Sequence, residues 1–174
     1  DRNLQIPNHE LMEKYESVLS RESMGEVKAI TDRSKEMLEA TLAEDEEKVA
    51  SILEEAHNRE LPFLQYNNEN SLSCVITLCY LAARDTYEIE REAKTGKGYC
   101  DYLFTPKKTG KPAIVLELKA GKSAEEAIQQ IKNRDYAAKV RKYRDILLVG
   151  INYDKDNTAK PHTCKIERIQ GTQD

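Results

Sequence analysis

The sequence has no surplus of positive charge. Its 27 lysines and arginines are outnumbered by 31 aspartates and glutamates, which gives a formal net charge of −4. Proteins that coat nucleic acid through bulk charge are strongly basic, so this class is excluded. Any contact with nucleic acid must therefore come from a local basic patch.

Cysteine and histidine patterns typical of zinc sites are also missing. The four cysteines show no C-x-x-C spacing, and the three histidines are scattered along the chain. Three of the cysteines occupy apolar strand or helix positions, so we expect reduced, buried thiols, as in a cytoplasmic protein. The cysteines are Cys74, Cys79, Cys100 and Cys164.

No apolar run is long enough to span a membrane and no signal peptide is present, so we expect no membrane partner. Gly121-Lys122-Ser123 looks like the end of a P-loop, but Leu116 stands where the first glycine of that motif is required. We therefore exclude nucleotide binding by this chain. The chain begins with Asp1 rather than Met, so we expect a fragment of a longer protein.

The first third of the chain is rich in Glu and Lys, and its apolar spacing predicts helices over residues 8–20, over residues 24–42 and from about residue 45. A solvated helical layer is the favoured interpretation of these charges. A proline then breaks the pattern. We expect a helical extension or linker at residues 1–62 and a separate domain at residues 63–174.

Residues 68–83 predict a further helix, whose apolar residues form one stripe. Glu69 lies on the face of this stripe, where an acid is costly unless something pairs with it. Alternatively, Glu69 is an exposed acid in the first turn that favours the helix dipole. The residues alone leave both interpretations open.

Two strands joined by a turn form the most informative stretch. Residues 96–104 and 113–119 are typical of strands, and folding this hairpin about Thr109 places Asp101 opposite Glu117. The period of two along a strand puts Lys119 on the same face as Glu117. The Cβ atoms of such cross-strand neighbours lie only ~4.5–5.5 Å apart, and two carboxylates held that close repel unless a cation lies between them. This stretch therefore predicts a site for a hard cation with a built-in positive group.

The remaining elements predict the sheet. A strand over residues 86–92 precedes the hairpin, and a capping box at Ser123 opens a helix that runs to about residue 138. Residues 146–151 are a continuous apolar run, typical of a strand buried on both faces, and residues 164–169 predict a final strand at an edge. A strand, a helix and a buried strand in sequence indicate a crossover beside the antiparallel hairpin, and hence a mixed sheet flanked by helices.

Basic residues cluster on and after the helix that follows the hairpin. They are either a solvated helix face or a set of contacts to a phosphate backbone. The cluster comprises Lys132, Arg134, Lys139, Arg141, Lys142 and Arg144.

Asp101 followed by Glu117-Leu118-Lys119 resembles the PD-(D/E)XK nuclease superfamily. The likeness runs over residues 67–153 and includes the glycines before Asp101 and a glutamine, Gln130, on the following helix. Within that superfamily, the chain resembles bacterial proteins that join an N-terminal AAA-ATPase-like domain to a C-terminal nuclease domain. The resemblance implies an α/β fold with a restriction-endonuclease-like αβββαβ core, preceded here by the helical extension, and an ATPase-like domain on the same polypeptide.

The resemblance also implies a metal-dependent nuclease that hydrolyses phosphodiester bonds, with DNA as the favoured substrate. Asp101, Glu117 and the carbonyl of Leu118 would bind Mg²⁺, with Mn²⁺ as the alternative ion. Lys119 would position or deprotonate the attacking water, or stabilise the phosphorus centre.

Glu69 and Gln130 complete the implied site. Glu69 would hold a second metal through water, and Gln130 would orient Lys119 or the phosphate. Substrate contacts would come from Lys132, Arg134, Lys139, Arg141 and Lys142. Oligomeric state stays open, although a homodimer would suit an enzyme that cuts both strands of a duplex.

Two other hypotheses stay open. The domain could be a catalytically inactive module that binds nucleic acid or protein for an attached ATPase domain. The charged residues could also be structural, with Asp101 and Lys119 forming a salt bridge.

Overall fold

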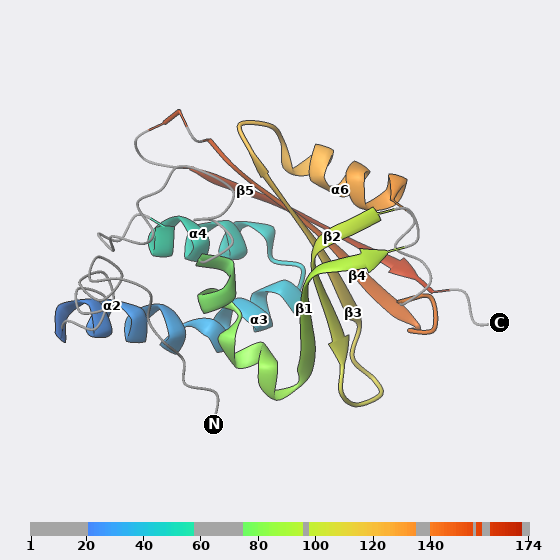
Figure 1. The fold of residues 1–174 in the computed structure, drawn as a ribbon, viewed down its shortest axis with the longest axis horizontal. Helices are drawn as coiled ribbons and strands as arrows, with labels where there is room; N and C mark the ends of the chain where they lie inside the picture. The colour runs from blue at the N-terminus through green and yellow to red at the C-terminus, as the bar shows by residue number, and fades with distance from the viewer. Residues whose placement is uncertain are drawn as a thin grey trace, which may run out of the picture.

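A five-stranded mixed sheet, with the order β1-β2-β3-β4-β5, forms the centre of the molecule (Figure 1). The computed structural model describes residues 21–57, 75–95, 98–134, 140–154, 156–157 and 161–171. The strands are β1 (Tyr87–Thr95), β2 (Gly98–Pro106), β3 (Ala113–Ala120), β4 (Asp145–Tyr153) and β5 (His162–Gln170). Strands β3 and β4 are parallel and all other neighbours are antiparallel, which confirms the predicted mixed sheet with β5 at an edge.

The β2–β3 hairpin has the predicted register. Tyr102 pairs with Leu116 and Phe104 with Ile114, so the ladder is centred on Thr109. The intervening turn contains a glycine at φ +92°, a conformation that favours glycine. Beyond Tyr102, strand β2 stays paired with β1 as far as its first residue.

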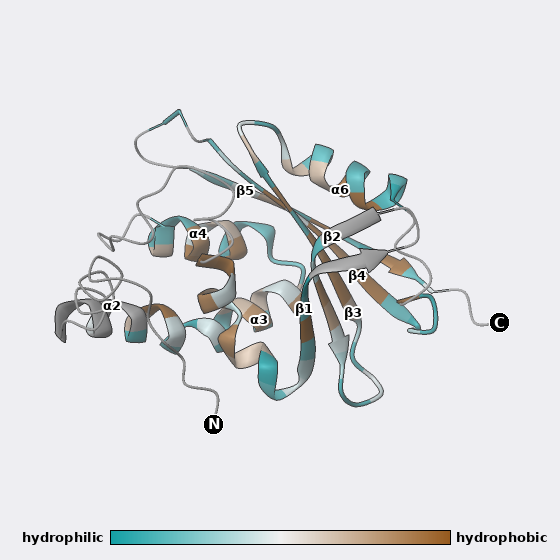
Figure 2. Cartoon of the chain, in the orientation of Figure 1, coloured by the Kyte–Doolittle hydropathy of each residue, from teal (hydrophilic) through white to brown (hydrophobic). Residues whose placement is uncertain are grey.

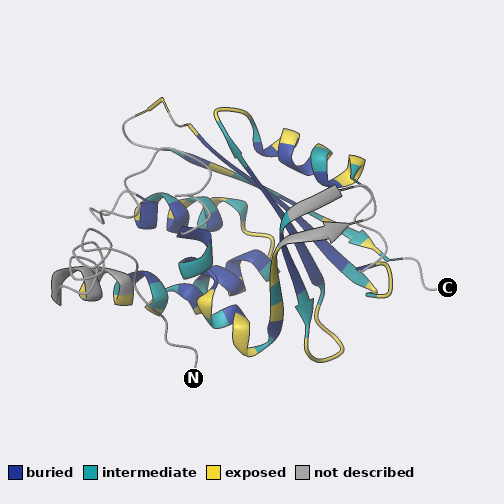
Figure 3. Cartoon of the chain, in the orientation of Figure 1, coloured by how far each residue is buried: buried dark blue, intermediate teal, exposed yellow. Residues whose placement is uncertain are grey.

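Side chains alternate between the two faces of the sheet along each strand, and both faces are buried in hydrophobic clusters. On one face, Leu116 and Val149 belong to the same hydrophobic cluster as residues of the N-terminal helices. On the other face, Val115 and Leu148 pack with Ile128. The apolar central strands are the most hydrophobic and most buried part of the fold (Figures 2 and 3).

Helices cover the two faces unequally (Figure 1). One face carries α6 (Ala124–Asn133), which contacts β3 and β4. The other face carries α3 (Ser34–Leu42), α4 (Glu46–His57) and the helical residues 75–79, which continue into the 3₁₀ helix η2 (Leu81–Asp85). Helix α2 (Arg21–Asp32) precedes α3.

The prediction of one helix over residues 24–42 was wrong, because the helix is interrupted at Arg33 between α2 and α3. The Arg33 N–H bonds to the carbonyl of Ile30, three residues back, at 3.2 Å. The next residue, Ser34, is buried, and its hydroxyl accepts a hydrogen bond from the Ala82 N–H at 3.1 Å. At the break, the polar side chain of Ser34 therefore contacts the start of η2, which is distant from it in sequence.

The apolar stripe predicted over residues 68–83 is confirmed for its described members, which are all buried. They are Val75, Ile76, Cys79, Tyr80 and Ala83. The α-helical part ends at Cys79, however, and the chain tightens into η2. The helix predicted over residues 8–20 and the position of Glu69 lie outside the described residues.

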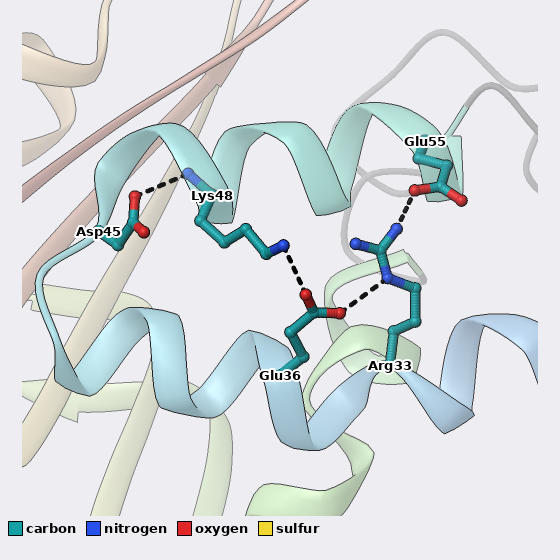
Figure 4. A network of polar contacts seen from close by, with 5 residues as sticks. All are labelled: Arg33, Glu36, Asp45, Lys48 and Glu55. Atoms are coloured by element: carbon teal, nitrogen blue, oxygen red, sulfur yellow. Dashed lines mark hydrogen bonds and ion pairs between the residues drawn. The ribbon is translucent and has the colours of Figure 1, made fainter.

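An exposed ion network joins α3 to α4 (Figure 4). Glu36 accepts from Lys48 at 2.5 Å and from Arg33 at 3.1 Å, and Arg33 also contacts Glu55. At the start of α4, Asp45 accepts a hydrogen bond from the Lys48 N–H at 3.0 Å. This network holds the two helices side by side.

Helix α4 also covers the outer edge of β5. The backbone N–H groups of Ile166 and His162 donate to the carboxylates of Glu46 and Glu54, at 2.8 and 3.3 Å. Helical extension and sheet thus share one core in the described residues, and the boundary at residues 62 and 63 stays a prediction. Among the described helices, none is long and apolar enough to cross a membrane.

Candidate active site

Asp101 and Glu117 meet where strands β2 and β3 separate. The last ladder pair is Tyr102 with Leu116, and one further step of the same register places Asp101 opposite Glu117. There the Asp101 carboxylate, rather than a backbone carbonyl, accepts the Leu118 N–H at 2.6 Å. A side chain of β2 is thus fixed against the backbone of β3, beside Glu117.

The two oxygens of the Glu117 carboxylate have different surroundings. The side chain is only 3% exposed. Oε1 accepts from the Gln130 amide, lies 3.2 Å from an Arg134 guanidinium nitrogen and lies 3.5 Å from Lys119 Nζ. Oε2 is buried and has no hydrogen-bond partner among the described residues. The protein therefore orients one oxygen and leaves the other available to a ligand.

Gln130 connects the two charged residues of strand β3. Its Nε2 donates to Glu117, and its Oε1 accepts from the Lys119 ammonium. An amide has one donor end and one acceptor end, so a single orientation serves both contacts. The Lys119 side chain, which is 12% exposed, pairs with Glu117 and Gln130 rather than with Asp101.

Burial, and after it the negative charge of Asp101, raise the pKa of Glu117 to about 7. The charges of Arg134 and Lys119 act in the opposite direction. A carboxylate in this state ionises near neutral pH, and a cation placed beside it would favour the ionised form.

The start of helix α6 brings Gln130 and Arg134 to strand β3. Ser123 Oγ accepts from the Glu126 N–H at 3.0 Å, which confirms the predicted cap. Gly150 of β4 is the register partner of Glu117, and a Cβ on it would lie 2.3 Å from the carbonyl oxygen of Ala124. Glycine here lets α6 approach the sheet closely enough for its side chains to reach the site.

The predicted basic cluster is divided. Lys132 pairs with Glu167 on strand β5 at 2.5 Å, whereas Arg134 turns toward Glu117. Arg141 and Lys142 are exposed before β4, and Lys139 lies outside the described residues, as does Glu69. The structure thus brings together Asp101, Glu117, Lys119, Gln130 and Arg134 and separates Lys132 from them. The assigned roles stay predictions.

A shallow depression adjoins this group on the outer side of α6. Its volume is about 420 Å³, and its lining consists of polar side chains. Gln130 and Arg134 belong to both the depression and the site, so they connect the buried carboxylate with the surface. The lining residues are Glu126, Gln129, Gln130, Asn133 and Arg134.

A family model of the PD-(D/E)XK nuclease superfamily matches residues 67–162, more than half of the chain. The chain belongs to this superfamily. The match includes Asp101 and Glu117-Leu118-Lys119, and the mixed sheet with flanking helices agrees with the restriction-endonuclease-like fold of PD-(D/E)XK domains. No curated protein sequence matches the chain.

PD-(D/E)XK nucleases generally use divalent metal ions, and the described residues fit such an ion. Asp101 and Glu117 supply the carboxylate oxygens that hard cations prefer, and Glu117 Oε2 is buried without a partner. No group of three or more His, Cys, Asp or Glu side chains in the described ranges is arranged around one point.

Sequence reasoning missed the contact of Arg134 with Glu117. A signal was present, because Arg134 follows Gln130 by four residues and so lies on the same helix face. It also missed Asn152, a buried residue of β4 whose side chain accepts the Lys122 N–H at 2.9 Å and fixes the turn between β3 and α6.

Proposed function

We propose that this chain is a metal-dependent nuclease that hydrolyses phosphodiester bonds, with DNA as the favoured substrate and Mg²⁺ or Mn²⁺ as the cofactor. The observation that carries the proposal is the Glu117 carboxylate, with one oxygen held by three donors and the other buried without a partner. An unpaired buried carboxylate oxygen is costly, and a cation shared with Asp101 would offset that cost.

Asp101 and Glu117 would hold the cation, and the Leu118 carbonyl is the third oxygen that we assign to it. The Leu118 N–H points toward Asp101. The N–H and carbonyl of one strand residue point to the same side, so this carbonyl faces the same space. When bound, the cation makes a water more acidic and stabilises charge on the phosphate.

Lys119 would act on the reacting atoms directly. Its ammonium is held by Gln130 and lies 3.5 Å from Glu117, so its direction is set before substrate arrives. We assign it to the attacking water or to a non-bridging phosphate oxygen. Gln130 would be a positioning residue, because it fixes both Lys119 and Glu117.

The wider context of the proposal rests on the sequence alone. It comprises an ATPase-like domain on the same polypeptide, a homodimer and substrate contacts from Lys132, Arg141 and Lys142. Glu69 and Lys139 keep their predicted roles, as a water-mediated ligand of a second metal and as a phosphate contact.

A cleavage assay tests the proposal. Labelled single-stranded and duplex DNA and RNA are incubated with the protein and Mg²⁺, Mn²⁺ or EDTA. We expect cleavage that needs the metal and disappears in Asp101→Asn and Lys119→Ala. The control is Glu36→Gln, a neutralised glutamate in the α3–α4 network, which should cut as the wild type does. Binding of nucleic acid without cleavage would favour the inactive module instead.

A further inference from the structure

Arg134 lies on the border between the buried site and the surface. It follows the last residue of α6, and its N–H bonds to the Gln130 carbonyl at 3.1 Å. Its guanidinium is 3.2 Å from Glu117 Oε1, although 38% of the side chain is exposed. Arg134 also lines the depression on α6. One side chain thus touches the candidate metal ligand and the space beside it.

We propose that Arg134 changes partner during substrate binding: it holds Glu117 in the metal-free protein and turns to a nucleic-acid phosphate when a cation takes its place. This inference rests on the proposed function and adds the coupling between its two ligands. Arg134 is then a positioning residue in one state and a phosphate contact in the other.

The first argument is that Glu117 can release Arg134 without losing its orientation. Gln130, a neutral amide, contacts the same carboxylate oxygen and stays in place when a cation binds. A cation bound at Oε2 would repel both positive groups beside this carboxylate, and Arg134, whose side chain is 38% exposed against 12% for Lys119, is the one that can turn outward. Cation binding therefore favours the outward position of Arg134.

The second argument is the charge of the depression. Apart from Arg134, its lining consists of one acid, Glu126, and three neutral amide side chains. Two of the amides, Gln129 and Asn133, bond to each other at 3.0 Å. Within this lining, Arg134 supplies the positive charge that a phosphate needs, and a guanidinium matches phosphate geometry through paired N–H groups.

Thermodynamic linkage turns this exchange into a prediction for affinity. If cation binding frees Arg134 for a phosphate, then the cation strengthens nucleic-acid binding and nucleic acid strengthens cation binding by the same factor. Without metal, Arg134 is engaged with Glu117, so its loss should change nucleic-acid affinity less than about twofold. With metal, Arg134 would contact phosphate, and its loss should weaken binding about tenfold, as for one charged hydrogen bond.

The test measures binding of a fluorescent mixed-sequence DNA, single-stranded and duplex, with Mg²⁺ and with EDTA. All proteins carry Lys119→Ala so that the probe is not cut. The variants are Arg134→Gln and Arg134→Lys, and thermal melts confirm that both are folded. The matched control is Arg168→Gln: Arg168 is 36% exposed and pairs with Glu44 at 2.6 Å, away from the site.

We expect Arg134→Gln to lose affinity only when Mg²⁺ is present, Arg134→Lys to lose less, and Arg168→Gln to match the parent under both conditions. An equal loss with Mg²⁺ and with EDTA would overturn the exchange of partners and leave a simple phosphate contact. An unchanged affinity in both conditions would overturn any contact with phosphate. If the parent protein binds neither Mg²⁺ nor DNA, the proposed function itself fails.

Discussion

Two glutamates of this chain each have two positive groups beside them, yet their pKa values are shifted in opposite directions. Glu36 lies in the exposed α3–α4 network (Figure 4), where the hydrogen bond from Lys48, followed by that from Arg33, lowers its pKa. Glu117 has Arg134 and Lys119 beside it, but burial raises its pKa to about 7. Similar partners thus give opposite results, and desolvation decides between them.

The difference separates a structural network from a site poised for chemistry. At Glu36 both oxygens have partners, so the network is complete and holds two helices together. At Glu117 one oxygen is buried without a partner, and a neighbouring aspartate adds repulsion. Such an arrangement costs stability in the metal-free protein, and clusters of perturbed groups of this kind are typical of functional sites.

The largest expected effect is on catalysis. Lys119→Ala should reduce cleavage about 10²–10⁴-fold, the usual contribution of a group that handles the reacting proton. Its Mg²⁺ affinity should stay within a few-fold of wild type, because the lysine is not a ligand. Single-turnover cleavage and calorimetric Mg²⁺ titration measure the two quantities. Lys48→Ala, the lysine beside Glu36, is the matched control, and equal losses in the two variants would contradict the assignment.

The next effect is on stability. The folded pKa of Glu117 is about 7, above its ordinary value of 4.5, so the folded state binds more protons between these pH values. Stability should therefore fall as the pH rises from 4.5 to 7 and stay low above it. Glu117→Gln should remove this fall and stabilise the metal-free protein by about 3 kcal/mol at most near neutral pH. Urea unfolding at several pH values in this range measures the free energy of unfolding. If it varies with pH in the same way in both proteins, the raised pKa of Glu117 is refuted.

A smaller effect is expected at the neighbouring acid. Asp101→Asn should stabilise the metal-free protein by about 1 kcal/mol, because it removes the charge that repels Glu117 while an amide oxygen can still accept the Leu118 N–H. It should weaken Mg²⁺ binding and cleavage together, since a hard anionic ligand is lost. Calorimetric melts with and without Mg²⁺ provide the test. Destabilisation of the metal-free protein would instead indicate a structural acid.

The smallest effect is expected in the exposed network. Glu36→Gln should lower stability slightly near neutral pH and not at all in acid, because a lowered pKa contributes stability only where the glutamate is ionised. Added salt should shrink the loss. Melting temperatures at low and high salt measure it. If Glu36→Gln changes stability as much as Glu117→Gln does, the distinction between an exposed structural network and a buried site is contradicted.

Local patterns in the sequence were enough for most of the sheet and for the centre of the site. The hairpin turn and the period of two set the register, so Asp101, Glu117 and Lys119 could be placed before the structure was known. The continuous apolar run of β4 likewise predicts burial on both faces. These features depend on neighbours in sequence.

Long-range contacts explain what could not be predicted. At the break between α2 and α3, Ser34 contacts Ala82, and Lys132 pairs with Glu167 on strand β5 instead of joining the site. The raised pKa of Glu117 depends on its burial in the folded protein, which no spacing within β3 encodes. Such partners are fixed only when the layers pack together.

The central claim is that the buried Glu117 carboxylate is held ready for a divalent cation. Thermal unfolding of the wild type and Glu117→Gln near pH 8, each with and without saturating Mg²⁺, tests it most directly, because a ligand that binds only the folded state stabilises it. We predict that Mg²⁺ raises the melting temperature of the wild type and leaves that of Glu117→Gln unchanged. An unresponsive wild type, or an equal rise in both proteins, would contradict the claim.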